Sequence, residues 1–248
     1  VRGGKGVANR SASILSAIFA FAIRRDLLID NPCRGVRKYR ENGRERFLSG
    51  AEWRQLEDAL DRAEKRGEHS SAINAIRLMM LTGCRKNEIV TLKWSYIDWT
   101  EGYLRLPDSK TGQKSIPVGA QVLALLQKLQ NSEHRPPAEE NPYVIYGNSS
   151  GQPFQGLQKV WARIRVDAGL EDVRLHDLRH SFASMALARG FNLYEIGALL
   201  GHKSTATTAR YAHLADDPLK DAAHKVSDSI TAAMHADATD NLYHLTNA

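Results

Sequence analysis

The chain contains only two cysteines, Cys33 and Cys84, among its 248 residues. Two cysteines cannot make a disulfide framework, and on their own they cannot supply the ligands of a zinc site. Their scarcity is consistent with a reducing cytosol. Small folds stapled by disulfides and cysteine-rich zinc modules are therefore excluded.

Long apolar runs are also scarce. None approaches the roughly 20 residues that a membrane-spanning helix needs, so no membrane helix is expected. No signal-peptide pattern is present, and because the chain begins at Val1 rather than Met, we expect it to be a fragment of something longer. With 42% hydrophobic and 25% charged residues, the composition is that of a soluble globular protein with one ordinary domain and a smaller piece.

Acidic residues are few at the start of the chain. Residues 1–47 hold 11 Lys or Arg against 4 Asp or Glu, a surplus of +7 (11 − 4). The other 201 residues hold 23 (34 − 11) against 24 (28 − 4), so the whole chain carries +6 (34 − 28). A basic N-terminal segment followed by a nearly neutral remainder predicts a nucleic-acid-binding arm joined to a domain with local basic patches. On charge alone, a solvated basic surface explains the run equally well.

Apolar residues recur at helical spacing over residues 9–26, which predicts a helix there. The Asn-Pro pair at 31–32 stops it, because Pro disfavours a helical residue before it. The polar stretch 37–46 has no apolar period and is predicted to be a linker. Ser49 and Glu52 then have the pattern of a capping box, which starts a new unit.

Helices dominate the rest of the pattern. They are expected at about 70–82, from near Arg85, around 123–129, at about 154–169, 176–189, 193–200 and 205–213, and as an amphipathic helix at 217–235. Two short strands, 103–106 and 115–118, are predicted to form a hairpin, with Pro117 placing the second at an edge. A further short strand is predicted at 143–146. The expected fold class is mixed and mainly α, with a small antiparallel β-sheet.

Tyr211 ends the run Leu-Gly-His-Lys-Ser-Thr-Ala-Thr-Thr-Ala-Arg-Tyr, which puts a phenol 9 positions (211 − 202) after His202. A free phenol has a pKa of about 10, so on the order of 0.1% is ionised at pH 7. Attack by its oxygen therefore needs a nearby base or a positive field that stabilises the phenolate.

Cationic residues upstream can supply such a field. Arg85 stands at a predicted helix start, and His176 and Arg179 share a helix face because they are three residues apart. During attack on a phosphodiester, negative charge grows on the non-bridging oxygens, and without a metal it must be met by fixed donors. Arginine suits this task because its planar fork bonds two oxygens at once. The set suits attack by a side-chain oxygen on a phosphodiester held without a metal.

These residues, in this order, resemble the tyrosine recombinase (phage integrase) family. The resemblance covers about residues 47–215. It implies a helical catalytic domain at 49–215, which cuts and rejoins DNA at specific sites through a 3′-phosphotyrosyl intermediate, with no metal, cofactor or external energy. By the same resemblance, residues 1–40 are the last helices of a core-binding domain that clamps DNA, 41–48 form a linker, and 216–248 form a tail helix that docks on a neighbouring protomer.

The resemblance also implies roles for single residues. Tyr211 would be the nucleophile, Arg85 and Arg179 would grip the scissile phosphate, and His176 and His202 would hydrogen-bond to it. Of the two histidines, His176 is the expected proton acceptor.

Three further side chains belong to this expected site. Lys110, at the hairpin tip, matches the family's mobile acid, which protonates the leaving 5′ oxygen, and Lys114 is the fallback. Glu88 is expected to orient an arginine rather than to act as a base. His180 is expected to pack against or support the phosphate clamp without touching the reacting groups.

The implied partner is double-stranded DNA carrying specific recombination sites, on which the protein would assemble as a tetramer. Directionality proteins or architectural proteins that bend DNA are further implied partners, and no membrane partner is implied. A mobile element such as a phage or prophage, acting in the bacterial cytoplasm or nucleoid, would be the setting.

Two other readings remain open. His176 and His180 are four residues apart and could share a metal in a hydrolase, although the zincin motif has Glu where Asp177 stands and Arg179 would repel a cation. The second is a DNA-binding protein with the recombinase fold that does not cut DNA. A covalent protein–DNA product formed in EDTA would argue against both.

Overall fold

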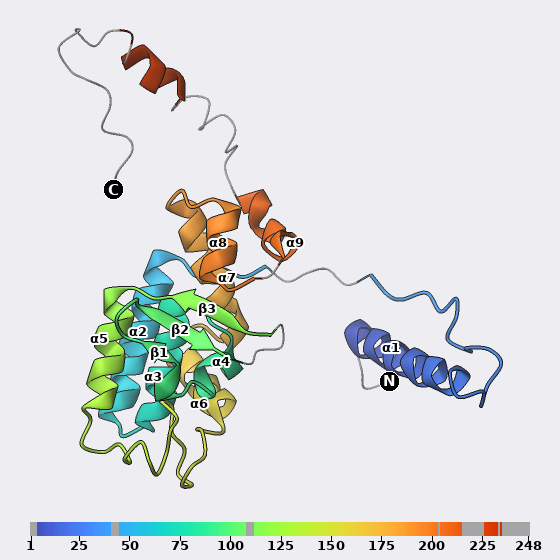
Figure 1. Ribbon diagram of the computed structural model, residues 1–248, viewed down its shortest axis with the longest axis horizontal. Coiled ribbons are helices and arrows are strands. Elements are labelled where there is room, and N and C mark those ends of the chain that lie inside the picture. Colours follow the sequence, from blue (N-terminus) through green and yellow to red (C-terminus); the bar gives the residue numbers. More distant parts are fainter. Residues whose placement is uncertain are drawn as a thin grey trace. The chain divides into compact units, whose positions relative to one another are not determined.

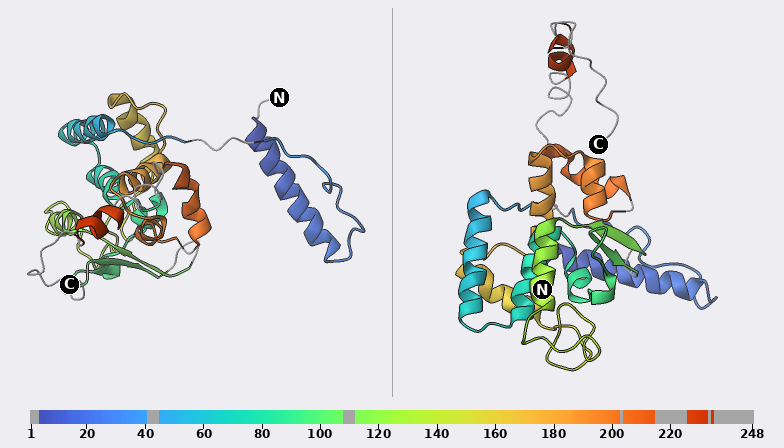
Figure 2. Two further views of the ribbon diagram at one scale, coloured as in Figure 1. Left: turned by 90° about the horizontal axis from the view of Figure 1, so that it is seen from above. Right: turned by 60° about the vertical axis from the view of Figure 1, so that its left-hand side comes forward.

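The computed structural model describes residues 4–40, 45–107, 112–202, 204–214, 226–232 and 234. The chain divides into two compact units, residues 1–45 and residues 46–248. Figures 1 and 2 show the elements of each unit.

The first unit is built on helix α1 (Lys5–Ile23). The helix ends before the predicted position because Asp26 adopts a left-handed backbone (φ 56°), and the N–H of Leu27 donates to the carbonyl of Ala22 at 3.0 Å. This six-to-one bond is the usual way for a helix to satisfy its last carbonyls. The segment after it is tied back to α1, since Asn9 and Tyr39 exchange two hydrogen bonds of 2.8 Å.

Helix α1 corrects the expectation that no apolar run is long enough for a membrane. It has 19 residues with a mean hydropathy of 1.4, and 6% of the apolar window is buried, so by length and composition it could cross a bilayer. Ser11, Ser13 and Ser16 interrupt its apolar residues, so the sequence has no unbroken apolar run there. A single helix of this kind near the start of a chain does not establish a membrane span, because core helices of soluble proteins and signal sequences have the same length and composition.

The second unit is mainly helical, which confirms the expected fold class (Figure 1). Its helices are α2 (Gly50–Lys65), α3 (Ser70–Thr82), α4 (Lys86–Val90), α5 (Ala120–Gln130), α6 (Leu157–Asp167), α7 (Leu175–Ala188), α8 (Leu193–Leu199) and α9 (Thr205–Thr208), with 3-10 turns η1 (Trp94–Tyr96) and η2 (Ala209–Leu214). The predicted capping box of Ser49 and Glu52 does start α2. Helix α3 is apolar on nearly all faces and contacts α2, α4, α5, α6 and α7, so it forms the centre of the core.

A three-stranded antiparallel sheet lies beside these helices, in the order β1 (Ile97–Asp98), β2 (Tyr103–Leu106) and β3 (Lys114–Pro117). The predicted hairpin is confirmed, with Leu104 opposite Ile116, and Pro117 lies on an edge strand. The strand predicted at 143–146 is wrong, because its ends make only isolated bridges to Lys93 and Pro153. Residues 108–111, including Lys110 at the hairpin tip, lie outside the described residues.

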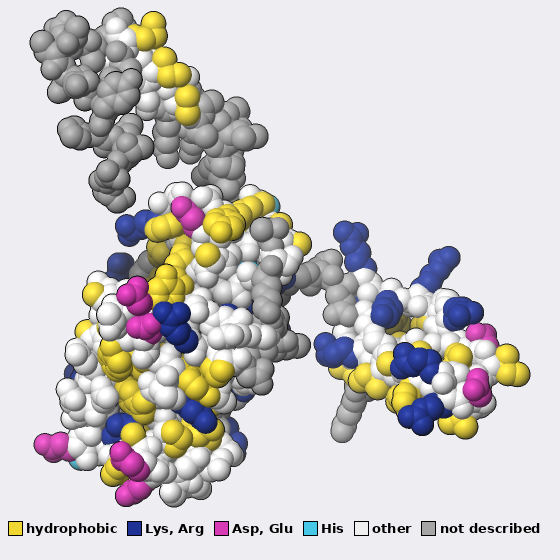
Figure 3. All heavy atoms as spheres, in the orientation of Figure 1, with side chains coloured by type: hydrophobic (Ala, Val, Ile, Leu, Met, Phe, Trp, Pro, Cys, Tyr) yellow, Lys and Arg dark blue, Asp and Glu magenta, His cyan; other side chains and the backbone are white. Residues whose placement is uncertain are grey.

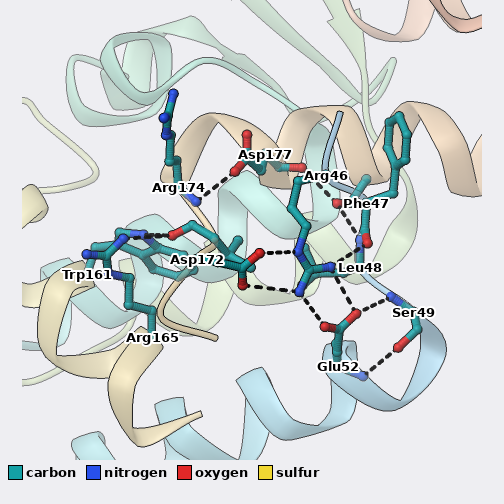
Figure 4. A network of polar contacts seen from close by, with 12 residues as sticks. Arg46, Phe47, Leu48, Ser49, Glu52, Trp161, Arg165, Asp172, Arg174 and Asp177 are labelled. Carbon is teal, nitrogen blue, oxygen red and sulfur yellow. Dashed lines mark hydrogen bonds and ion pairs between the residues drawn. The ribbon is translucent and has the colours of Figure 1, made fainter. Parts of the chain in front are cut away.

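The first residues of the second unit brace helix α7 (Figure 4). The guanidinium of Arg46 donates to Glu52 at the start of α2 and, at 2.7 Å, to Asp172 just before α7. The N–H of Leu48 donates to the hydroxyl of Ser181 on α7 at 2.9 Å. A helix held at both its start and its middle can carry side chains in fixed positions, and α7 carries three residues of the candidate site.

Candidate active site

Arg179 is the most buried cation of the site, with 3% of its surface exposed. Its Nη1 donates to the carbonyl oxygen of Gly83 at 2.8 Å, and its Nη2 donates to that of Leu200 at 2.9 Å. These two carbonyls lie at the ends of α3 and α8, so the guanidinium is fixed between two helices. Gly83 has a left-handed backbone (φ 63°), and a Cβ there would come within 2.7 Å of Phe182, which explains why glycine ends α3.

Arg85 stands immediately before α4 and is oriented by Glu88. The Glu88 carboxylate accepts the backbone N–H and the Nη1 of Arg85, both at 2.9 Å. Burial lowers the pKa of Arg179, and the positive charge of Arg85 lowers it further. The two guanidinium groups repel each other, and an anion bound between them would offset this repulsion.

Glu88 also binds Lys114, whose Nζ lies 2.6 Å from Glu88 Oε1. Both side chains are buried, at 5% and 8% exposure. Burial lowers the pKa of Lys114, although Glu88 opposes this. Gly201 makes room for the lysine, since a Cβ there would lie 2.9 Å from Lys114 Cδ. Lys114 therefore links strand β3, α4 and the turn before His202.

We expect Lys114→Met to destabilise the protein by about 3 kcal/mol, because the buried Glu88 carboxylate loses its buried counter-charge and keeps only the partly exposed guanidinium of Arg85. The matched control is Arg105→Met, which breaks the more exposed pair of Arg105 with Asp98 and should cost under about 1 kcal/mol. Urea unfolding curves of the two variants would measure both values. Equal losses would show that the Lys114–Glu88 pair contributes no more than a surface pair.

Tyr211 lies in η2 and is 3% exposed, packed among Ala183, Ala186, Ile196 and Leu200. Its hydroxyl oxygen is 2.7 Å from Nδ1 of His180. Burial raises the pKa of Tyr211, while Arg179 and Arg210 oppose the rise. Burial lowers the pKa of His180 to about 4. The phenol is therefore protonated at neutral pH, and it donates its hydrogen to Nδ1 when the neutral imidazole carries its own hydrogen on Nε2.

The other two histidines are also neutral and near the arginines. The ring of His176 meets that of His180 edge-on, with centroids 4.7 Å apart. Burial and then Arg179 and Arg85 lower the pKa of His176, and the same causes lower that of His202 to about 4. Nδ1 of His202 is 2.8 Å from the hydroxyl of Thr208, which is fully buried. Neutral histidines in a cationic pocket can donate to an anion without requiring a proton from solvent.

The structure thus brings most of the expected residues together. Arg85, His176, Arg179, His202 and Tyr211 lie close enough for their charges to influence one another. The group that contacts the phenol is His180, which was expected only to support the clamp, and within the described residues no hydrogen bond joins His176 to Tyr211.

Sequence reasoning also missed the partner of His202. Thr208 lies six residues after it and hydrogen-bonds its ring, but a threonine in a run of threonines gives no distinguishing signal.

A metal-dependent hydrolase needs several ligand side chains grouped around one ion. Among the residues that the structure describes, no three His, Cys, Asp or Glu side chains are grouped so that they could hold a metal ion. Asp177, between the two histidines in sequence, accepts the N–H of Arg174 at 2.8 Å and so caps its own helix. His180, one of the two histidines that the hydrolase reading needs, is hydrogen-bonded to Tyr211.

Residues 46–217, which is 172 of 248 residues (217 − 46 + 1), match the phage integrase family. The chain belongs to this family, whose members are tyrosine recombinases that cleave and rejoin DNA through a tyrosine nucleophile.

Two relatives show the extent of the similarity. The shufflon-specific DNA recombinase of Escherichia coli is 29% identical over 206 residues, which are 82% of this chain and 49% of the relative. Tyrosine recombinase XerC of Staphylococcus saprophyticus is 26% identical over 216 residues, which are 86% of this chain and 72% of XerC. The chain thus spans about half the length of the first relative.

Solved structures share the fold. A lambda integrase dimer bound to a COC′ core site has a TM-score of 0.63 at 23% identity, covering 84% of this chain and 73% of that chain. A lambda integrase tetramer bound to a Holliday junction has a TM-score of 0.62 at 23% identity, covering 86% and 60%. At these identities the likeness establishes the fold and does not by itself assign residues.

Proposed function

We propose that this chain is the catalytic part of a site-specific DNA recombinase that cuts and rejoins strands through Tyr211. The observation that carries the proposal is a buried phenol close to two guanidinium groups. The charge of Arg179 lowers the pKa of Tyr211, and the charge of Arg85 lowers the pKa of Arg179. A phosphodiester placed there would offset the repulsion of the arginines and lie next to the nucleophile.

The chemistry follows from these positions. Arg85 and Arg179 bind the non-bridging oxygens, on which charge accumulates as the phenolic oxygen bonds to phosphorus. The bond from phosphorus to the 5′ oxygen breaks, leaving a 3′-phosphotyrosyl link and a 5′ hydroxyl. Lys110 is the proposed donor of the proton to that oxygen. Because Lys114 is ion-paired with Glu88, its proposed role is to position Arg85 through Glu88.

His202 is proposed to donate a hydrogen bond to the scissile phosphate. If the Thr208 hydroxyl donates to Nδ1, the imidazole proton lies on Nε2, which can donate to a phosphate oxygen. His176 is proposed as a second donor to the same phosphate, since it shares the charge environment of Arg85 and Arg179.

The proposed partner is double-stranded DNA at specific recombination sites, in the bacterial cytoplasm or nucleoid. The first unit suits such a partner, because its described Lys and Arg side chains are exposed, and Figure 3 shows several of them on one face of this unit. Assembly as a tetramer on DNA is proposed from the lambda integrase tetramer, and directionality or DNA-bending proteins are proposed helpers. The mass of the complex on paired sites would test this, and one protomer per site would contradict it.

The experiment that tests the function is a suicide-DNA assay with EDTA present. A duplex carrying the element's own end sequence is nicked beside the cleavage position, so that the short cleaved fragment diffuses away and the covalent product accumulates. We expect a protein–DNA band that survives denaturation and is unaffected by EDTA. A band lost in EDTA would favour a metal-dependent hydrolase, and a mobility shift without any covalent band would favour a DNA-binding protein that does not cut.

A further inference from the structure

His180 and Tyr211 are joined by a short hydrogen bond between two elements that are far apart in sequence. Nδ1 of His180, on α7, lies 2.7 Å from the phenolic oxygen, within the reach at which a base can take a proton. The two rings are 5.7 Å apart at 60°, so the imidazole meets the phenol at its hydroxyl end. This contact places a basic nitrogen on the atom that must lose its proton.

The surroundings keep the imidazole of His180 neutral, the charge state in which it can accept a proton. The ring of His176 stands edge-on to His180 at 4.7 Å, and neighbouring positive charge comes from Arg210 and Arg179, opposed by Asp177. These groups and burial keep His180 neutral. In the tautomer whose hydrogen lies on Nε2, the Nδ1 lone pair is directed at the Tyr211 hydroxyl. A bound phosphodiester would bring a negative charge that offsets the nearby arginines and makes this nitrogen more basic.

We propose that His180 takes the phenolic proton of Tyr211 as the nucleophile attacks, an assignment that rests on the proposed recombinase function. As the phenolic oxygen bonds to phosphorus, its O–H bond breaks and the proton passes to Nδ1, giving an imidazolium. The bond to the 5′ oxygen breaks, and that oxygen takes a proton from the separate acid. In the rejoining step the 5′ hydroxyl attacks phosphorus and gives its proton back to the conjugate base of that acid, while the bond from phosphorus to the phenolic oxygen breaks and His180 returns its proton to the departing phenolate.

Two variants of His180 separate proton transfer from positioning. His180→Phe keeps a ring of similar shape but removes the acceptor, whereas His180→Asn keeps an acceptor near Nδ1 that cannot hold the proton. We expect both to slow single-turnover formation of the covalent product by about 100-fold or more, with DNA affinity within about twofold of the unaltered protein. An Asn variant as fast as the unaltered protein would overturn the proposal, since a hydrogen bond alone would then suffice.

A more acidic nucleophile gives the decisive readout. With difluorotyrosine incorporated at position 211, the phenolate forms without a base, so His180→Phe should regain most of its lost rate. A substrate with sulfur at the 5′ bridging position should give no such rescue, because it removes the need for the leaving-group acid only. Rescue by sulfur, or no rescue by difluorotyrosine, would show that His180 does not accept the phenolic proton of Tyr211.

Controls keep this test distinct from that of the function itself. His134→Asn alters an exposed histidine away from the site and should leave the rate unchanged. Circular dichroism would verify that the His180 variants are folded, and the Asn variant retains a polar partner for the buried hydroxyl. If the unaltered protein forms no covalent product, the recombinase proposal fails; if it does and His180→Phe is equally fast, the role of His180 alone fails.

Discussion

Tyr211→Phe is expected to bind DNA with nearly unchanged affinity and to form no covalent product. The substitution removes one oxygen from a buried ring, and with it the nucleophile and the hydrogen bond to His180. Loss of a nucleophile in other enzymes reduces the rate by 10⁴-fold or more, on the order of the whole catalytic effect. The structural cost should be small, roughly 1 kcal/mol, because a single hydrogen bond is lost and the apolar packing is kept.

Denaturing gels of the suicide-DNA reaction would measure this outcome, and peptide mapping of the unaltered protein would place the adduct. Tyr194→Phe is the matched control, since Tyr194 is 75% exposed on α8 and should form product at the normal rate. An adduct mapped to any tyrosine other than Tyr211 would remove the assignment.

Much of the second unit could be predicted from sequence because its signals are local. The capping box at Ser49 and the hairpin at 103–118 each depend on residues a few positions apart. The failures were of a different kind. The end of α1 depends on a non-glycine residue, Asp26, taking a left-handed conformation, and the run at 143–146 has strand-like composition but only isolated bridges to pair with.

The candidate site divides in the same way. The spacing of His176 and Arg179 on one helix face follows from sequence, as does the hydrogen bond of Glu88 to Arg85 three residues earlier. The contact of His180 with Tyr211 spans 31 residues, and that of Lys114 with Glu88 joins a strand to a helix. Neither follows from periodicity or propensity, because both depend on how separate elements pack.

Arg179→Ala is expected to reduce cleavage by roughly 10²–10³-fold, or about 3–4 kcal/mol, as for loss of one donor from an oxyanion hole. DNA binding should fall far less, because many other phosphate contacts remain along a DNA footprint. The change also leaves the carbonyls of Gly83 and Leu200 without the donors that now satisfy them, so some loss of stability is expected.

Two comparisons separate catalysis from stability. Arg179→Lys keeps the positive charge but lacks the fork that spans both carbonyls and a phosphate, so it should remain slow in cleavage. Arg85→Ala removes a less buried guanidinium, 31% exposed, and leaves Glu88 still paired with Lys114, so it should lose cleavage at a smaller cost in stability. Single-turnover rates, DNA affinities and urea unfolding would be measured for each variant. If affinity and rate fall equally in both alanine variants, the arginines hold the phosphate of the ground state and do not stabilise the transition state preferentially.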